Sequence, residues 1–239
     1  MTSLGPFALG TARVLFTGRD GGVSEAPYAS LNLSFLTGDE PDRVGENRRR
    51  AIVRLGGDAE RAAWVRQVHG RGVVEAGTAG LDRFLASAAE PLEGDVLWTA
   101  EPGVTVAAFG ADCTITALVG AGRVCVVHAG WPGLLAGALE AGVGAVGADP
   151  VCIVGPSAGP CCYAVRADVG DPLRARFGDD CVVDGRADLW RCAERALRAA
   201  GAAEVTIVRR CTICDAAFFS HRRDGAPGGR QAVLAMLDA

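Results

Sequence analysis

Two short apolar runs near the middle of the chain, separated by a turn, predict a β-hairpin. Residues 114–119 and 124–127 consist largely of β-branched and apolar side chains, which favour strands. Gly120-Ala-Gly-Arg123 between them has the composition of a tight turn. If the numbers of opposed residues sum to 241, Cys113 lies directly opposite His128, with Cβ atoms about 4.5–5.5 Å apart. A turn one residue longer leaves the two as diagonal neighbours, so the hairpin predicts a thiol beside an imidazole.

Further apolar runs predict strands and helices on both sides of this hairpin. The predicted strands cover residues 14–17, 63–69, 94–99, 104–109, 151–154 and 205–208. The predicted helices cover residues 40–55, with Asp39 as N-cap, 133–142, 168–177 and 187–200. Arg48, Arg49 and Arg50 point in three directions on the first helix, so at most one of them faces inward. We expect an irregular connection over residues 76–93, and residues 231–237 are compatible with either a strand or a helix.

Composition places these elements in a globular protein. Apolar residues make up 49% of the 239 residues and charged residues 22%, and neither a repeat nor a low-complexity linker interrupts them. We therefore expect a single domain over residues 1–239. A net charge of −4 without an extended basic block argues against nucleic-acid binding, and the interrupted apolar runs argue against a membrane span. An odd count of nine cysteines behind an N-terminus without a secretory signal predicts reduced thiols in the cytoplasm.

The predicted pair of Cys113 and His128 is compatible with three kinds of site. Thiolate and imidazole are both zinc ligands, and three protein ligands with an open position are typical of catalytic zinc. His69 is then the best candidate for the third ligand, because His221 lies among cations. Alternatively, Cys113 is a nucleophile with His128 as its base. Asp112 would orient a group or transfer a proton in either case. The third interpretation is a structural cysteine beside a core histidine.

Two further cysteine pairs carry a weaker signal. Cys211-Thr-Ile-Cys214 is a single C-x-x-C without a second pair or a nearby histidine, which is weak evidence for structural zinc. Cys161-Cys162 would add thiols, but nothing in the sequence brings the two pairs together. We expect buried, apolar thiols at these positions.

Taken together, the motifs along the chain resemble the YfiH/YlmD laccase-domain family, in that family's order and over nearly the whole length. The motifs are Phe16-Thr-Gly-Arg-Asp-Gly-Gly-Val-Ser24, Tyr28-Ala-Ser-Leu-Asn-Leu33, Gly38-Asp39, Glu46-Asn47-Arg48, Gln67-Val-His69-Gly70, Gly94-Asp95, Ala111-Asp-Cys113, His128-Ala-Gly-Trp131, Gly155-Pro-Ser-Ala-Gly-Pro-Cys-Cys-Tyr163, Asp188-Leu189, Cys211-Thr212 and Phe219-Ser-His-Arg-Arg-Asp-Gly225. Each is weak alone, and the combination is specific.

The resemblance implies an α+β fold with mixed β-sheets flanked by helices. It also implies a zinc site formed by His69, Cys113 and His128. The implied chemistry is phosphorolysis of adenosine, inosine, guanosine and methylthioadenosine, together with deamination of adenosine. An older interpretation of the family is a copper-dependent polyphenol oxidase, but three histidines in total cannot fill a copper cluster and a separate electron-transfer site.

If the family chemistry holds, arginines neutralise phosphate and polar residues of the matched loops bind the nucleoside. The candidate substrate residues are Arg19, Asn32, Ser157 and Arg222. Pro132 stands where the family commonly has an arginine, so either phosphorolysis is weaker here or a neighbouring arginine compensates. Gly18 and His221 likewise replace a common serine or threonine and a common tyrosine.

Overall fold

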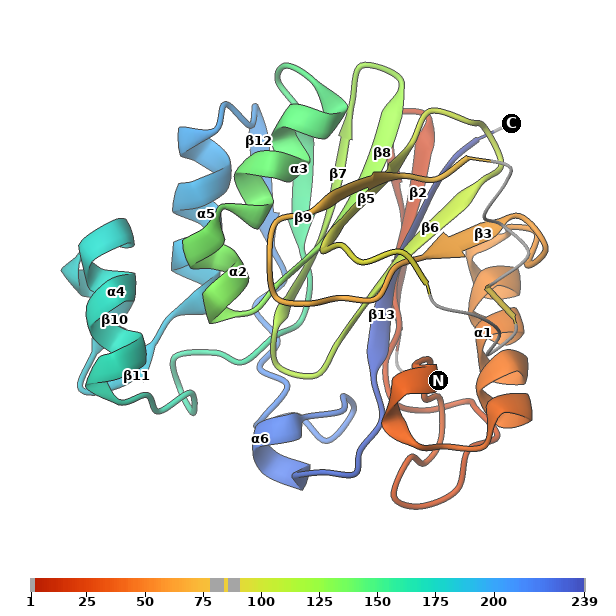
Figure 1. The fold of residues 1–239 in the computed structure, drawn as a ribbon, viewed down its shortest axis with the longest axis horizontal. Helices are drawn as coiled ribbons and strands as arrows, with labels where there is room; N and C mark the ends of the chain where they lie inside the picture. Colours follow the sequence, from red (N-terminus) through yellow and green to blue (C-terminus); the bar gives the residue numbers. More distant parts are fainter. Residues whose placement is uncertain (1–2, 78–83, 86–90, 239) are drawn as a thin grey trace.

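Two β-sheets, packed face to face, lie at the centre of the molecule (Figure 1). The computed structural model describes residues 3–77, 84–85 and 91–238. The first sheet has the strand order β1 (Leu4–Leu9), β2 (Ala12–Phe16), β13 (Gln231–Leu237), β6 (Thr105–Gly110) and β3 (Ala62–Trp64). The second has the order β12 (Glu204–Ile207), β9 (Val151–Val154), β7 (Thr114–Gly120), β8 (Arg123–Ala129), β5 (Val96–Thr99) and β4 (Val73–Glu75). Strands β10 (Val182–Val183) and β11 (Arg186–Ala187) pair as a separate antiparallel ribbon.

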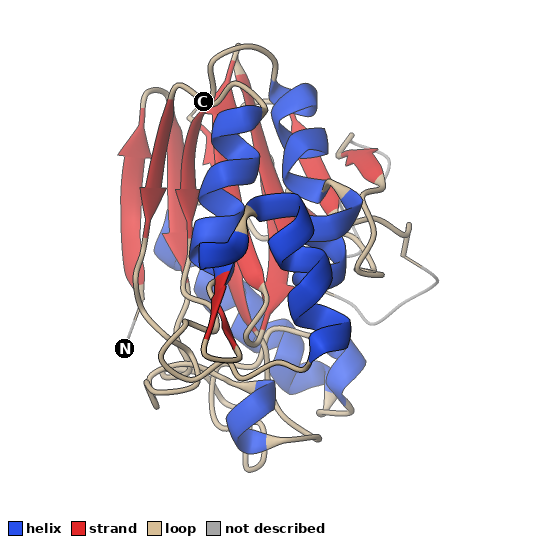
Figure 2. Cartoon of the chain, turned by 90° about the vertical axis from the view of Figure 1, so that its left-hand side faces the viewer, coloured by secondary structure: helices blue, strands red, loops and turns tan. Residues whose placement is uncertain are grey.

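Helices cover the outer face of each sheet, which gives four layers. Helix α1 (Pro41–Leu55) packs on the first sheet. The second sheet is covered by α2 (Trp131–Ala136), α3 (Ala138–Val146), α4 (Ala167–Phe177) and α5 (Leu189–Ala199), which lie in front of the strands in Figure 2. The described residues also form the short helix α6 (His221–Asp224) and the 3-10 turns η1 (Phe35–Thr37) and η3 (Asp179–Cys181). The expected α+β fold with mixed sheets flanked by helices is confirmed.

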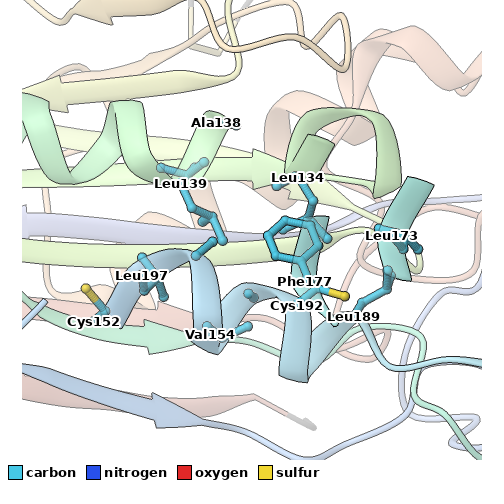
Figure 3. Packing of buried hydrophobic residues seen from close by; sticks show 14 of the residues in the cluster. Leu134, Ala138, Leu139, Cys152, Val154, Leu173, Phe177, Leu189, Cys192 and Leu197 are labelled. Carbon is cyan, nitrogen blue, oxygen red and sulfur yellow. The ribbon is translucent and has the colours of Figure 1, made fainter. Parts of the chain in front are cut away.

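The central strands are buried on both faces because each sheet lies between two layers. In β7, Ile115 and Ala117 face the other sheet, whereas Leu118 faces the helices. In the helix layer, Leu134, Leu139, Phe177 and Leu197 converge on the second sheet (Figure 3). Burial on both faces explains why these strands appear in the sequence as continuous apolar runs rather than alternating ones.

The register of the central hairpin differs from the predicted one. Gly120 pairs with Arg123 and Thr114 with Ala129, so opposed residue numbers sum to 243 and the loop is Ala121-Gly122. Both loop residues have positive φ, 46° and 70°, as a two-residue hairpin loop requires. His128 therefore opposes Ile115, and Cys113 is its diagonal neighbour. The direct opposition was wrong, but the proximity it predicted is real.

Several element boundaries also shift. Helix α1 begins after Glu40, because the buried Asp39 carboxylate accepts hydrogen bonds from Ser24 and Asn32 instead of capping the helix. As expected, only one of the three consecutive arginines turns inward: Arg48 is fully buried. The strand predicted over residues 63–69 ends at Trp64, which leaves His69 in a loop.

Helix 133–142 is in fact two helices, α2 and α3, joined at Gly137 in a left-handed conformation. The tail forms β13, in the middle of the first sheet. Residues 78–83 and 86–90 of the predicted irregular connection lie outside the described residues. Among the helices of the described part, none has the length and apolarity to cross a membrane.

Candidate metal centre

His69, Cys113 and His128 come together at one end of the space between the two sheets. His128 occupies the end of β8 and shares its face with Val124 and Val126, which point to the first sheet. Cys113 lies where the chain leaves β6 in the first sheet and enters β7 in the second. His69 lies in the loop that follows β3. Three separate segments thus each contribute one side chain.

The three side chains form a compact set of metal donors. Their potential ligand atoms all lie within 4.8 Å of one another. The His69 Nε2 is 3.9 Å from the Cys113 Sγ, and the imidazole rings of His69 and His128 are 4.8 Å apart at 79°. His128 is buried, Cys113 is half-buried and His69 is exposed. The set therefore has a buried floor and an open side, as a site with a free coordination position requires.

Asp95, just before β5, holds two of these residues in place. Its fully buried carboxylate accepts a hydrogen bond from the His128 Nδ1 at 2.8 Å. It also accepts the backbone N–H groups of Val68, His69 and Gly70, at 3.2, 3.1 and 2.7 Å, and so fixes the loop in which His69 has a φ of 59°. A carboxylate on one nitrogen of a ligand histidine fixes the tautomer that frees the other nitrogen for a metal. Sequence reasoning noted Gly94-Asp95 as a motif but assigned this carboxylate no role.

The electrostatics of the site favour a thiolate. Burial by itself would raise the pKa of Cys113, but the adjacent His128 and His69 lower it to about 6. Burial by itself would lower the pKa of His128, but the Cys113 sulfur and the Asp95 carboxylate raise it to about 9. Two imidazoles and a thiolate are zinc donors, and this thiol ionises readily. The residues present therefore fit a bound zinc ion.

Asp112 lies beside Cys113, with its carboxylate occupied by protein donors. One oxygen accepts the Thr212 hydroxyl at 2.6 Å, and the other accepts the backbone N–H of Arg222 at 2.6 Å. Its φ of 87° is rare for a residue other than glycine, and these two bonds help to hold it. In this arrangement Asp112 positions the start of helix α6 next to the candidate centre.

Two cavities meet at the three donors. The first, of about 360 Å³, is walled by Trp64 and Phe109 and also receives Arg230. The second, of about 350 Å³, is lined by Trp131, Pro132, Tyr163 and Arg222. His69, Cys113 and His221 border both cavities. The first, called the aromatic cavity below after Trp64 and Phe109, also holds the half-buried Arg230, whereas the second has Trp131 and Tyr163 beside the exposed Arg222.

The structure places the four predicted substrate residues differently. Arg222 lines the second cavity, and its guanidinium lies over the Tyr163 ring at 4.8 Å. Arg19 borders neither cavity and pairs with Asp224 at 3.3 Å. Asn32 is fully buried and ties the loop before α1 to the backbone of Arg230. Ser157 is also fully buried, and its backbone pairs with Arg210 and Thr212.

Sequence reasoning did not find the residues that shape the cavities. Trp64 and Phe109 belong to strands of the first sheet, and their rings meet edge to face at 6.0 Å. The cationic neighbours of His221 argue against a metal ligand at this position, yet His221 borders both cavities. Trp64 and Phe109 are 45 positions apart, and Phe109 and His221 are 112 positions apart. No spacing pattern links residues at such distances.

The chain is similar to known proteins over almost its whole length. The profile of the protein family described as Multi-copper polyphenol oxidoreductase laccase matches residues 13–238. A Pseudomonas aeruginosa protein named purine nucleoside phosphorylase is 38% identical over 241 residues, which cover 95% of this chain and 94% of that protein. Escherichia coli YfiH, with the same name, is 33% identical over 88% of each chain. The crystal structure of YlmD from Geobacillus stearothermophilus superposes with a TM-score of 0.88 and 32% identity, over 98% of this chain and 94% of that one.

Proposed function

Because this chain belongs to the multi-copper polyphenol oxidoreductase laccase family, we propose that it is a zinc-dependent purine nucleoside phosphorylase. One observation carries the proposal: two histidines and a cysteine converge where the cavity of Trp64 and Phe109 meets the cavity of the exposed Arg222. The relatives at 38% and 33% identity bear the name of this activity. We further propose adenosine, inosine, guanosine and methylthioadenosine as substrates, deamination of adenosine as a second activity, and the cytoplasm as the site of action.

His69, Cys113 and His128 are the proposed zinc ligands. When bound there, zinc would supply a Lewis acid that polarises a substrate oxygen or activates water. Copper oxidase chemistry fits the residues less well, since the whole chain has three histidines and the set contains one cysteine and two of them. Asp95 serves as a positioning residue for this set.

The aromatic cavity suits the nucleoside. A purine needs an apolar, polarisable wall, and Trp64 and Phe109 provide one beside His69 and Cys113. Gln67 fixes this wall, because its side-chain amide donates to the Phe109 carbonyl at 2.6 Å and accepts the Phe109 N–H at 2.8 Å. The ribose would then lie nearest the centre, where its anomeric carbon faces the second cavity.

The second cavity suits phosphate. Pro132 and Arg222 line the same cavity, so Arg222 supplies a cation on the wall where the family's common arginine is missing. Arg222 is exposed, and its guanidinium donates to the Ala164 carbonyl at 2.7 Å, which fixes one side of the group. In phosphorolysis a phosphate oxygen bonds to the anomeric carbon as the purine leaves with the bonding electrons and gains a proton. His221 borders both cavities and is the proposed donor of that proton.

Incubation of zinc-loaded protein with adenosine and inorganic phosphate tests the function. We expect adenine and ribose 1-phosphate from phosphorolysis, and inosine from deamination, separated by chromatography. The His69→Ala protein should form neither product above the background rate. Absence of both products from the wild type would refute the proposal. Oxidation of a phenolic dye that requires copper would favour the oxidase, and ester hydrolysis that persists after chelation would favour a cysteine hydrolase.

Substitution of Arg222 tests the assignment of the phosphate cavity. A hydrogen bond to a charged group contributes about 1.5–3 kcal/mol, so Arg222→Gln should raise the KM for phosphate about tenfold or more. The KM for the nucleoside should change little, because Arg222 does not border the aromatic cavity. Arg19→Gln is the matched control, since Arg19 borders neither cavity. An equal rise in both variants would contradict the assignment.

A further inference from the structure

Four of the nine cysteines form a second cluster, separate from the three donors described above. Cys161 and Cys162 lie in the loop after β9, and Cys211 and Cys214 in the turn after β12. The Sγ of Cys214 is 2.6 Å from that of Cys162 and 3.4 Å from that of Cys161. All four sulfur atoms lie within 4.8 Å of one another.

Sheet topology brings these two pairs together. Strands β9 and β12 are parallel neighbours, with Val154 beside Ile207. Their carboxyl ends therefore leave the sheet at the same edge. A bridge between Ser157 and Cys211 extends the pairing beyond the strands, with Thr212 N–H donating to the Ser157 carbonyl at 3.1 Å. No local pattern predicts this proximity, because the pairs are about 50 positions apart in the sequence.

The exposure of these thiols argues against simple packing. Cys161 and Cys214 are exposed, Cys162 is half-buried and Cys211 is buried. By contrast, the four cysteines that serve only the apolar core are all buried: Cys125, Cys152, Cys181 and Cys192. The expectation of buried, apolar thiols is therefore wrong for three of the four members of the cluster. Their exposure also leaves a path by which an ion reaches the sulfur atoms.

The backbone supplies a hydrogen bond to one of these sulfur atoms. The Cys211 Sγ accepts the Gly159 N–H at 3.2 Å, from the loop that also carries Cys161 and Cys162. A backbone N–H donated to sulfur favours the thiolate, the form in which a cysteine binds a metal ion.

We propose that Cys161, Cys162, Cys211 and Cys214 bind a second zinc ion through four sulfur atoms. Four thiolates form a closed donor set, the arrangement typical of structural rather than catalytic zinc. Tetrahedral Zn–S bonds place sulfur atoms about 3.8 Å apart, within the 2.6–4.8 Å span of this cluster. Binding releases thiol protons to solvent and changes no oxidation state.

This ion would brace loops that border the first centre. The loop of Cys161 and Cys162 runs directly into Tyr163, which lines the cavity of Arg222. The turn of Cys211 and Cys214 contains Thr212, whose hydroxyl holds Asp112. Zinc at the cluster therefore fixes both loops against each other at the wall of the second cavity.

Zinc content in a Cys113→Ser background tests the proposal independently of the first centre. Protein prepared under reducing conditions, loaded with zinc and desalted, should retain one zinc per chain as Cys113→Ser and none as Cys113→Ser/Cys214→Ser. Adding Cys152→Ala instead should leave the count at one, because Cys152 is a buried thiol on β9 outside the cluster. Equal zinc in the single and the Cys214→Ser double variant would overturn the proposal.

Cobalt substitution provides a readout that does not depend on activity. Co²⁺ added to metal-free Cys113→Ser protein should give the intense sulfur-to-cobalt absorption of a four-thiolate tetrahedral site. The additional substitution Cys161→Ser, at an exposed position that the core does not need, should weaken this absorption. Absence of the band, or a Cys162–Cys214 disulfide found by mass spectrometry in metal-free protein purified without oxidant, would overturn the proposal.

Discussion

The Cys113→Ser protein is expected to lose one bound zinc per chain and at least about a hundredfold in kcat/KM for adenosine phosphorolysis. Serine keeps nearly the same shape but its hydroxyl does not ionise at neutral pH, so the set loses its anionic donor. The two remaining imidazoles, one of them exposed, are a weak set for a divalent ion. The fold should persist, because Cys113 is half-buried and lies outside the strands.

Elemental analysis of the wild type beside Cys113→Ser, with kinetics on the same samples, measures this effect. Cys152→Ala is the control, since it removes a buried thiol elsewhere in the second sheet. We expect that control to keep the wild-type metal content and turnover. The same metal content in wild type and Cys113→Ser would show that this cysteine is not a ligand.

The second large effect is expected at Asp95. Asp95→Asn should weaken zinc binding at the first centre about 10–100-fold, the usual cost of losing a carboxylate behind a ligand histidine. The carboxylate accepts hydrogen bonds from the His128 Nδ1 and from three backbone N–H groups at once. Asparagine has one acceptor oxygen, and its NH₂ group cannot accept any of these bonds. Either the His128 ring or the His69 loop therefore loses its anchor.

Competition with a chelator of known affinity, in the Cys214→Ser background, measures zinc binding at this centre alone. Asp39→Asn is the matched control: Asp39 is another buried carboxylate, and it accepts the Ser24 hydroxyl and the Asn32 amide rather than any group of the three donors. Both variants should lose stability in denaturant unfolding, by about 1–3 kcal/mol. Only Asp95→Asn should lose zinc affinity. A similar loss in Asp39→Asn would mean that Asp95 acts through general stability.

Both effects follow from an arrangement in which each donor comes from a different segment. His128 is carried by a strand buried on both faces, so the packing of two sheets fixes its backbone. His69 is carried by a loop whose three N–H groups converge on a single carboxylate. Asp95 thus couples the rigid donor to the loop donor, and we expect one substitution there to disturb both.

The sequence predicted the elements well where a helical period or a run of β-branched residues marks them. The apolar stripe of α1 appears in the structure within one or two residues, and so do β7 and β8, which their β-branched residues marked as strands although both are largely buried. Residues 231–237 stayed open between strand and helix. All seven residues of β13 are buried, so no alternation marks a strand, and Val233 is their one β-branched residue. The predicted hairpin register was wrong for a different reason. The register depends on which two residues of Gly120-Ala-Gly-Arg123 take positive φ, and more than one pair there is compatible with a turn.

The sequence by itself determined the chemistry available to this protein: three histidines, nine cysteines and the motifs that identify its family. It also placed Cys113 near His128, because a hairpin is a local structure whose partners are close along the chain. Only the tertiary structure decided what Asp95 holds, which arginine faces the second cavity, and that Cys161, Cys162, Cys211 and Cys214 meet. Those relations depend on sheet order and on parallel neighbours distant in sequence, and no local periodicity encodes which strands lie side by side.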